Sequence, residues 1–284
     1  MPTDFASLLT KEAEAIVQEV GATVDARTLV NAVLSELPRS GDGRWILARA
    51  RELLIKAAYA TRPYCIRCGK CCMSGSPTLL HDDLALFGRG VLKPEHLVTI
   101  RSGEPAYFNV TEEVGACGAE MLKIRETAGT RTCIFFAPPG TCTIHDSRPV
   151  QCALQECWNP EKAQENAHAR RLTRRDLLED AGEFLSIIER HEQRCSYHEL
   201  LRAIARLRAT KGQTVTELIE LLKFDEYVRS FVVERLGLDR EHLGFFFGRP
   251  LSESLDLYGL RLAKQPDGSF FLTTAESGDT SRER

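Results

Sequence analysis

The sequence lacks several features that would assign it quickly to a class of protein. No apolar run approaches the roughly 18 uninterrupted residues that predict a membrane-spanning helix. The first residues carry acidic side chains early and do not resemble a secretory signal peptide. Lysine and arginine total 37 against 40 aspartates and glutamates, so no global positive field attracts nucleic acid or a membrane surface. We therefore expect a cytoplasmic protein with no membrane partner and no nucleic-acid partner.

Two further absences narrow the function. The helical parts of the sequence contain no glycine-rich loop that would hold a nucleotide cofactor, and no internal repeat divides the chain. The 284 residues, 43% of them hydrophobic, are enough for one or two domains with a sizeable core. Evidence about function must therefore come from other residues.

Cysteine is what this sequence has in excess. Nine of the ten cysteines lie between Cys65 and Cys157, and only Cys195 lies outside that stretch. Structural disulfides are rare in a reducing cytoplasm. A tight cluster of cysteines there is more typical of a metal or iron–sulfur site than of a disulfide framework.

The first group of cysteines lies in Y-C-I-R-C-G-K-C-C-M-S-G, residues 64–75, which contains Cys65, Cys68, Cys71 and Cys72. The C-x-x-C-x-x-C spacing allows one short loop to wrap a metal centre, and a glycine relieves the backbone where the loop turns. Thiolates bind zinc, at about 2.3 Å, or the irons of a cluster. Adjacent side chains tend to diverge, so we expect Cys71 and Cys72 to serve different metals, unless one of them packs in the core.

The second group comprises Cys133, Cys142, Cys152 and Cys157, in C-I-F-F-A-P-P-G-T-C-T-I-H-D-S-R-P-V-Q-C-A-L-Q-E-C-W. The Pro-Pro-Gly sequence at 138–140 predicts a turn, which would place Cys133 and Cys142 together at its base. A fourth ligand for the first loop can come from this group or from Cys72.

The two groups together resemble the CxxCxxCC family, also called the zinc- or iron-chelating domain or the YkgJ-like cysteine-cluster family. The family pattern continues C-x-F-L…C-x-I-Y-x-x-R-P-x-x-C, and the resemblance covers about residues 62–157. His145 stands where the family usually has tyrosine; it could add a nitrogen ligand, but we expect it to replace a packed aromatic ring. The resemblance implies metal or iron–sulfur binding through Cys65, Cys68, Cys71, Cys72, Cys133, Cys142 and Cys152, with Cys157, just beyond the usual pattern, as a further metal ligand.

The spacing alone does not decide between zinc and an iron–sulfur cluster. The C-x-x-C-x-x-C core resembles the ferredoxin loop, in which three close cysteines and one remote cysteine hold a four-iron cluster. We therefore favour a 4Fe–4S cluster held by Cys65, Cys68 and either Cys71 or Cys72, with one ligand from the second group. Two zinc ions are the alternative.

Three functions are compatible with such a centre. The first is an accessory, electron-transfer or maturation protein whose helices bind a protein partner. The second is an enzyme that uses the metal centre to modify a protein or small molecule. The third is a zinc-stabilised interaction protein or a thiol redox switch, and the switch would require exposed, reactive thiols without metal.

The periodicity of apolar residues predicts a mainly α-helical protein with an irregular cysteine-rich module between helical regions. We expect helices over residues 1–60, the cysteine module over 61–160, helices over 161–240, and an extension over 241–284. In that extension a Pro-Asp-Gly turn indicates a small hairpin, and the last ten residues are polar and expected to be disordered.

A few local features carry expectations of their own. Gly21 should end the first helix and Asp25 should cap the second, while Thr214 and Glu217 have the spacing of a capping box. We expect Cys117 and Cys195 to be structural. The basic group Arg170, Arg171, Arg174 and Arg175 is expected to be a solvated helix face rather than a site for RNA.

Overall fold

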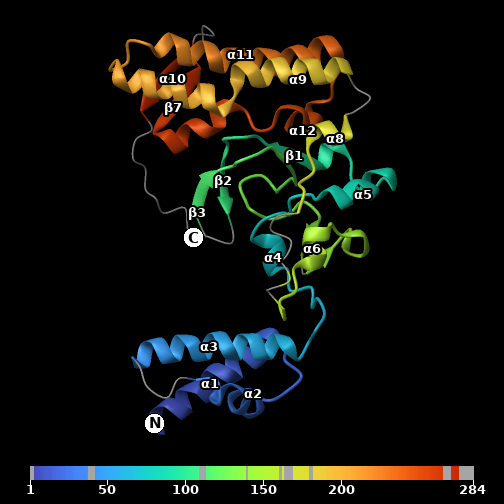
Figure 1. Cartoon of the computed structure of the whole chain (residues 1–284), viewed down its shortest axis with the longest axis vertical. Helices are drawn as coiled ribbons and strands as arrows, with labels where there is room; N and C mark the ends of the chain where they lie inside the picture. Colours follow the sequence, from blue (N-terminus) through green and yellow to red (C-terminus); the bar gives the residue numbers. More distant parts are fainter. Residues whose placement is uncertain are drawn as a thin grey trace. The chain divides into compact units, whose positions relative to one another are not determined.

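The computed structural model forms two compact units, each built from two stretches of the chain (Figure 1). Unit 1 comprises Met1–Lys70 and Phe135–Ala169, and unit 2 comprises Cys71–Ile134 and Arg170–Arg284. Both stretches of cysteine-rich sequence are thus shared between the units. The predicted boundaries near residues 60, 160 and 240 stay a prediction. The residues that the structure describes are 3–37, 42–108, 113–138, 140–159, 162, 169–178, 182–264 and 270–274 of the 284.

Unit 1 is a three-helix bundle followed by a small hairpin. Its first helix ends where Gly21 takes a φ of +64°, and its second begins where the Asp25 carboxylate accepts a hydrogen bond from the amide of Thr28. Both of these expectations are met. The elements of unit 1 are α1 (Thr3–Val20), α2 (Ala26–Leu34), α3 (Gly43–Ala60), β5 (Phe136–Ala137), β6 (Thr141–Cys142), η3 (His145–Ser147) and α6 (Val150–Leu154).

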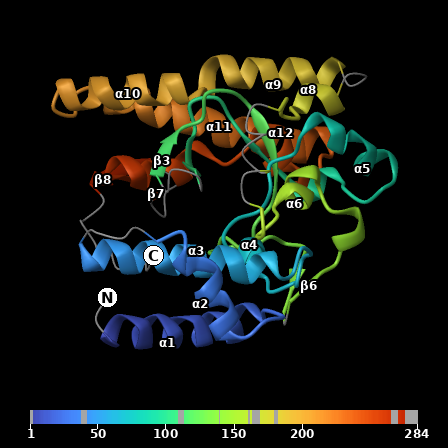
Figure 2. The same cartoon turned by 60° about the horizontal axis from the view of Figure 1, so that its bottom comes forward.

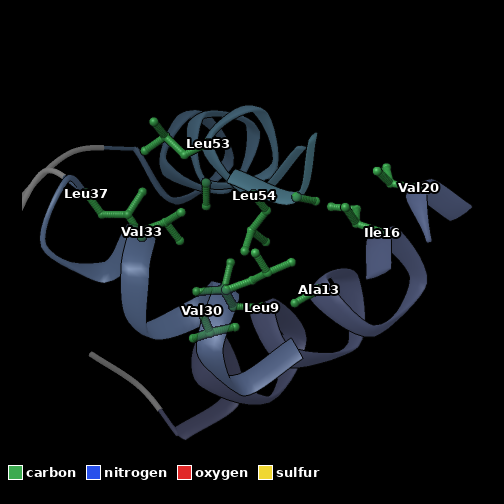
Figure 3. Packing of buried hydrophobic residues seen from close by; sticks show 12 residues of the cluster. Leu9, Ala13, Ile16, Val20, Val30, Val33, Leu37, Leu53 and Leu54 are labelled. Carbon is green, nitrogen blue, oxygen red and sulfur yellow. The ribbon is translucent and has the colours of Figure 1, made fainter. Parts of the chain in front are cut away.

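The core of unit 1 lies between its three helices. Leu9 and Ile16 of α1 recur at helical spacing, so they form one apolar stripe on that helix. Figure 3 shows this stripe meeting Val30 of α2 and Leu54 of α3 in the space between the helices. Burial of these side chains is the main stabilisation of the bundle, because the hydrophobic effect grows with the apolar area removed from water.

Unit 2 contains the remaining described elements. They are α4 (Lys70–Met73, whose first residue belongs to unit 1), η1 (His81–Asp83), α5 (Leu84–Gly88), η2 (Pro94–His96), β1 (Leu97–Ile100), β2 (Pro105–Phe108), β3 (Glu113–Ala116), β4 (Met121–Ile124), α8 (Arg174–Leu177), α9 (Gly182–Cys195), α10 (Tyr197–Ala209), α11 (Val215–Leu236), η4 (Arg240–His242), α12 (Leu243–Phe247), η5 (Leu251–Tyr258), β7 (Leu260–Lys264) and β8 (Phe270–Thr274). The helices α9, α10 and α11 pack against one another, and they lie together in both Figure 1 and Figure 2.

The strands of unit 2 form three antiparallel pairs, β1 with β4, β2 with β3, and β7 with β8. Leu172 lies beside the β1–β4 pair. Its amide donates to the carbonyl of Leu79, and its carbonyl accepts from the amide of Leu122. These hydrogen bonds join the segment after the second cysteine group to the segment after the first.

The predicted fold class is confirmed: the described residues are mostly helical, with small two-stranded sheets that include the C-terminal hairpin β7–β8. The turn of that hairpin and the last ten residues lie outside the described residues. The capping box predicted at Thr214 is wrong, because Thr214 precedes α11 but makes no side-chain cap, and its carbonyl instead accepts from the amide of Glu217. Among the described residues, no helix has the length and apolar character to span a membrane.

Candidate metal centre

The loop that carries Cys65 and Cys68 belongs to unit 1, and both side chains are exposed. Between and beyond them the backbone turns sharply, with a φ of +57° at Arg67 and +78° at Gly69. The left-handed region is uncommon for a residue with a side chain such as arginine. Residues in that region help to turn consecutive amide groups to one side, as in the concave nests that bind anionic groups, including many iron–sulfur sites.

This loop packs against the β5–β6 hairpin of the same unit. A Cβ atom on Gly69 would lie 2.5 Å from Cζ of Phe136, so the close approach requires glycine. Gly140, in the turn of the hairpin, similarly lies against the carbonyl oxygen of Arg67. The position of the Cys65–Cys68 loop therefore depends on two glycines, one on each side of the contact.

One of the two cysteines expected at the base of the hairpin turn lies in the hairpin itself. Cys142 lies opposite Phe136 in the register of β5 and β6. Cys133 comes before the hairpin and belongs to unit 2. The two-residue strands therefore pair Cys142 with Phe136, and the prediction that Cys133 and Cys142 lie together at the base of the turn stays a prediction.

The remaining thiols of unit 1 follow the hairpin. Cys152 is half-buried on α6, and Cys157 is exposed just after it. Before α6, the guanidinium of Arg148 donates to the carbonyl oxygen of His145 at 3.0 Å, so this arginine holds the turn that leads into the helix. Pro149, which immediately precedes α6, fixes its start.

Tyr59, near the end of α3, shows that thiols from the two cysteine groups are neighbours within unit 1. Burial raises the pKa of its phenol, and the charges of the Cys157 and Cys68 thiolates raise that pKa further, against the opposing effect of Lys70. Lys70 itself forms an ion pair with Glu19 of α1. The bundle, the first loop and the segment after α6 thus meet around Tyr59.

In unit 2, Cys71 and Cys72 lie side by side on α4, with their Sγ atoms 4.0 Å apart. The two sulfurs approach although adjacent side chains of a helix do not face each other, so the expectation that they diverge is not met. Two thiolates on one tetrahedral zinc lie about 3.8 Å apart, as follows from a Zn–S bond of about 2.3 Å. The carbonyl of Cys72 also accepts a hydrogen bond from the amide of Cys133 at 2.9 Å.

Cys117 and Cys195 are buried, in line with the structural role expected of them. The Cys117 thiol donates to the carbonyl of Ala119 at 3.0 Å, and burial raises its pKa. Burial also raises the pKa of Cys195 to about 12, so its sulfur stays a protonated thiol. Among the described residues, no cysteine forms a disulfide.

Sequence reasoning missed the one group of three possible ligands whose ligand atoms come together among the described residues, and it lies outside the two cysteine groups. His191 and Cys195 of α9 and Asp225 of α11 place their ligand atoms within 4.8 Å of one another. The carboxylate of Asp225 already accepts hydrogen bonds from His191, Arg229 and the amide of Leu251. With a protonated thiol and an arginine in place, this cluster is a polar part of the core. The four-residue spacing on α9 indicates that His191 and Cys195 share a face, but only packing brings α11 to them.

The basic group after the second cysteine segment makes more specific contacts than predicted. Arg174 is buried, 3% exposed, and forms ion pairs with Glu120 and Glu192, which corrects the expectation of a solvated face. Arg170 and Arg175 are 66% and 76% exposed, as expected of a solvated face, although these two and Arg171 also have polar partners. Arg170 pairs with Asp176, Arg175 with Glu189, and Arg171 donates to the hydroxyl of Thr78.

Comparison with known families agrees with the cysteine pattern. Residues 64–172 match the family described as "CxxCxxCC: Putative zinc- or iron-chelating domain". The match extends past Cys157 to Leu172, whose backbone bonds to Leu79 and Leu122. No curated protein and no solved structure matches the chain.

Proposed function

From the premise that residues 64–172 are a CxxCxxCC domain, a zinc- or iron-chelating module, we propose that this protein holds an iron–sulfur cluster in an accessory, electron-transfer or maturation role. The proposed ligands are Cys65, Cys68 and either Cys71 or Cys72, completed by Cys133, Cys142 or Cys152. Cys157, beside Tyr59, is the further candidate. When bound, such a cluster would supply one-electron transfer.

The observation that carries the proposal is the 4.0 Å separation of the Cys71 and Cys72 sulfurs. As neutral thiols the two groups make an S–H···S contact; once both are deprotonated they would repel each other, and a cation bound between them removes that cost. Soft thiolate donors select zinc and iron–sulfur clusters over hard cations such as magnesium or calcium.

Two features support a cluster over zinc. The left-handed backbone at Arg67 and Gly69 is of the kind that directs amides toward anionic sulfur. Three cysteines at C-x-x-C-x-x-C spacing also match the loop that holds four-iron clusters. Hydrogen bonds from amides to sulfur are one of the means by which a protein sets the reduction potential of a cluster.

The test is the metal content of protein purified without oxygen. We expect iron and acid-labile sulfide together, with the brown colour of thiolate-to-iron charge transfer. Stoichiometric zinc without sulfide would overturn the cluster and show that the cysteines hold zinc instead. Protein without either metal and with reactive thiols would overturn the proposal in favour of a redox switch.

Single substitutions assign the ligands. At least one of Cys71→Ser and Cys72→Ser should lower the iron bound per chain, because serine is a poor ligand for these metals. Cys117→Ser is the matched control, since that thiol donates to the carbonyl of Ala119 and a hydroxyl can do the same. Equal iron content in all three variants would exclude the Cys71–Cys72 pair from the centre. The expected protein partner stays a prediction.

A further inference from the structure

His145 has a ring nitrogen that no group in the structure satisfies. Its Nε2 atom is buried and has no hydrogen-bond partner, and the side chain as a whole is 18% exposed. The residue begins η3, three positions after Cys142 on β6. A buried polar atom without a partner loses its hydration and gains nothing in return, so such atoms are uncommon and call for an explanation.

The other ring nitrogen, Nδ1, has two polar neighbours. Nδ1 of His145 lies 3.3 Å from Oδ1 of Asp146 and 3.4 Å from Nη2 of Arg67. A neutral imidazole carries its proton on one nitrogen only. Arg67 can only donate a hydrogen bond, so the contacts of Nδ1 with Arg67 and with Asp146 belong to different tautomers. In the tautomer whose Nδ1–H donates to Asp146, Nε2 carries a lone pair that no donor in the structure meets.

That lone pair belongs to the part of unit 1 that carries the thiols. Arg67, which touches the ring, is located between Cys65 and Cys68, and its carbonyl packs against the hairpin turn that precedes Cys142. The imidazole thus lies next to Arg67, the residue through which the first loop contacts the hairpin. A packed aromatic ring, the role expected from the sequence, would not leave a nitrogen unsatisfied at this position.

We propose that Nε2 of His145 is one of the four ligands of the metal centre, beside the thiolates of the first loop and in place of a thiolate from the second cysteine group. This inference rests on the proposed function, that the domain binds metal at all. Imidazole nitrogen binds both zinc and iron. Ligating histidines almost always donate their other ring N–H to a carboxylate, carbonyl or water, and Asp146 is placed to be that acceptor.

The ligand has a consequence for the chemistry of the centre. In a cluster, replacement of thiolate by imidazole raises the reduction potential, because a neutral ligand stabilises the oxidised irons less than an anionic one. In a zinc site it would give a mixed set of thiolates and one nitrogen, which is common in structural zinc sites. The nitrogen is detectable by spectroscopy in either case.

The experiment is pulsed electron paramagnetic resonance of protein labelled with nitrogen-15 histidine. Metal content is measured first on the unaltered protein: absence of any metal would overturn the proposed function and the inference with it. For an iron–sulfur protein the reduced cluster is the probe, and for a zinc protein the cobalt(II)-substituted form is the probe. We expect the hyperfine coupling of a directly bound imidazole nitrogen.

Two variants identify the histidine. His145→Tyr, which restores the family's usual residue, should abolish the nitrogen coupling. His198→Tyr should preserve it, because that side chain on α10 is 80% exposed and lies in unit 2. Metal-loaded protein without nitrogen coupling, or coupling that persists in His145→Tyr, would overturn the inference and leave metal binding intact. Since the coupling is sought in the unaltered protein, a misfolded variant does not prevent the test.

Asp146→Asn tests the orienting role of the carboxylate. Loss of such an acceptor lowers metal affinity by roughly 10- to 100-fold. We expect at least a tenfold loss in competition with a chelator, with unchanged stoichiometry at saturating metal. An affinity equal to that of the unaltered protein would contradict the orientation assigned to the ring.

Discussion

Nε2 of His191 lies 2.7 Å from Oδ1 of Asp225, and both side chains are buried in unit 2. Burial alone would raise the pKa of Asp225, but the hydrogen bond from His191 and the charge of Arg229 outweigh it and lower the pKa to about 2. Burial lowers the pKa of His191 despite its aspartate partner. The pair is therefore a carboxylate and a neutral imidazole. The lack of any partner on Nδ1 of His191 agrees, because a second N–H there would be unsatisfied.

The first prediction concerns the stability that Asp225 provides. Asp225→Asn removes the negative charge opposite Arg229, whose side chain is only 9% exposed. Loss of one partner of a buried ion pair costs about 3–5 kcal/mol in the free energy of unfolding. Urea unfolding measures the change. Glu220→Gln, at an exposed position of the same helix, should stay within about 0.5 kcal/mol of the unaltered protein. Equal midpoints for both variants would contradict the role given to Asp225.

The second prediction is a loss of stability in acid that depends on His191. Unfolded histidine has a pKa of about 6.5. Because the folded pKa is lower, the unfolded state binds more protons below that pH, and stability falls as the pH decreases from about 6.5. The contribution of Asp225 is complete above its unfolded pKa, near 3.9, and is lost as the pH falls toward about 2.

Melting temperatures between pH 7.5 and 5 test the histidine part. His191→Gln should reduce the dependence on pH, because glutamine cannot take up a proton. His198→Gln should leave the dependence unchanged, since that residue is exposed on α10. If His191→Gln kept the full slope, another group would have to account for it.

The third prediction concerns the reactivity of the thiols. The thiolate is the nucleophile, so Cys195, buried and with a pKa raised to about 12, should resist iodoacetamide in the native protein at pH 8. Cys65 and Cys68 are exposed and should be alkylated in metal-free protein but protected when metal is bound. Mass spectrometry of peptides reads out each position. Denaturation should release Cys195, and rapid labelling of it before denaturation would show that its burial is wrong.

The fourth prediction concerns the contact that positions the first loop. Gly69→Ala should lower the free energy of unfolding, because alanine is strained in the left-handed backbone conformation and its Cβ would clash with Phe136. Gly129→Ala is a matched control, since Gly129 has a similar φ of +73° and no atom within 4 Å of the added Cβ. Both should lose roughly 1–2 kcal/mol from the backbone. We expect only Gly69→Ala to lower the metal bound per chain, and equal metal content in both would mean that the loop–hairpin contact does not position the ligands.

Local patterns predicted the helices well and their caps less well. Asp25 caps α2 as expected, because its extended backbone aims the carboxylate at the amide of Thr28. Thr214 fails as a cap because its backbone, with a φ of −96° and a ψ of +21°, is not extended, and a side-chain cap requires an extended backbone. Both positions carry a residue type that commonly caps helices. They differ in the backbone conformation with which the chain enters the helix.

The candidate site divides in the same way. The spacing of cysteines in sequence was enough to find the similarity of residues 64–172 to a family described as zinc- or iron-chelating. It did not predict that the Cys71 and Cys72 sulfurs lie 4.0 Å apart, because this depends on the side-chain conformations that the two residues adopt in the folded chain. It also gave no sign of the unsatisfied nitrogen of His145, because burial is a property of the packed chain.

The sequence by itself determined the mainly helical fold class and the similarity to a metal-chelating family, because both depend on spacings of a few residues along the chain. Only the tertiary structure decided which of the ten thiols are buried and inert, and that Asp225 of α11 meets His191 of α9. Those outcomes depend on side chains from distant segments, whose pairing is selected by the burial of apolar area and the satisfaction of buried polar groups in the folded molecule.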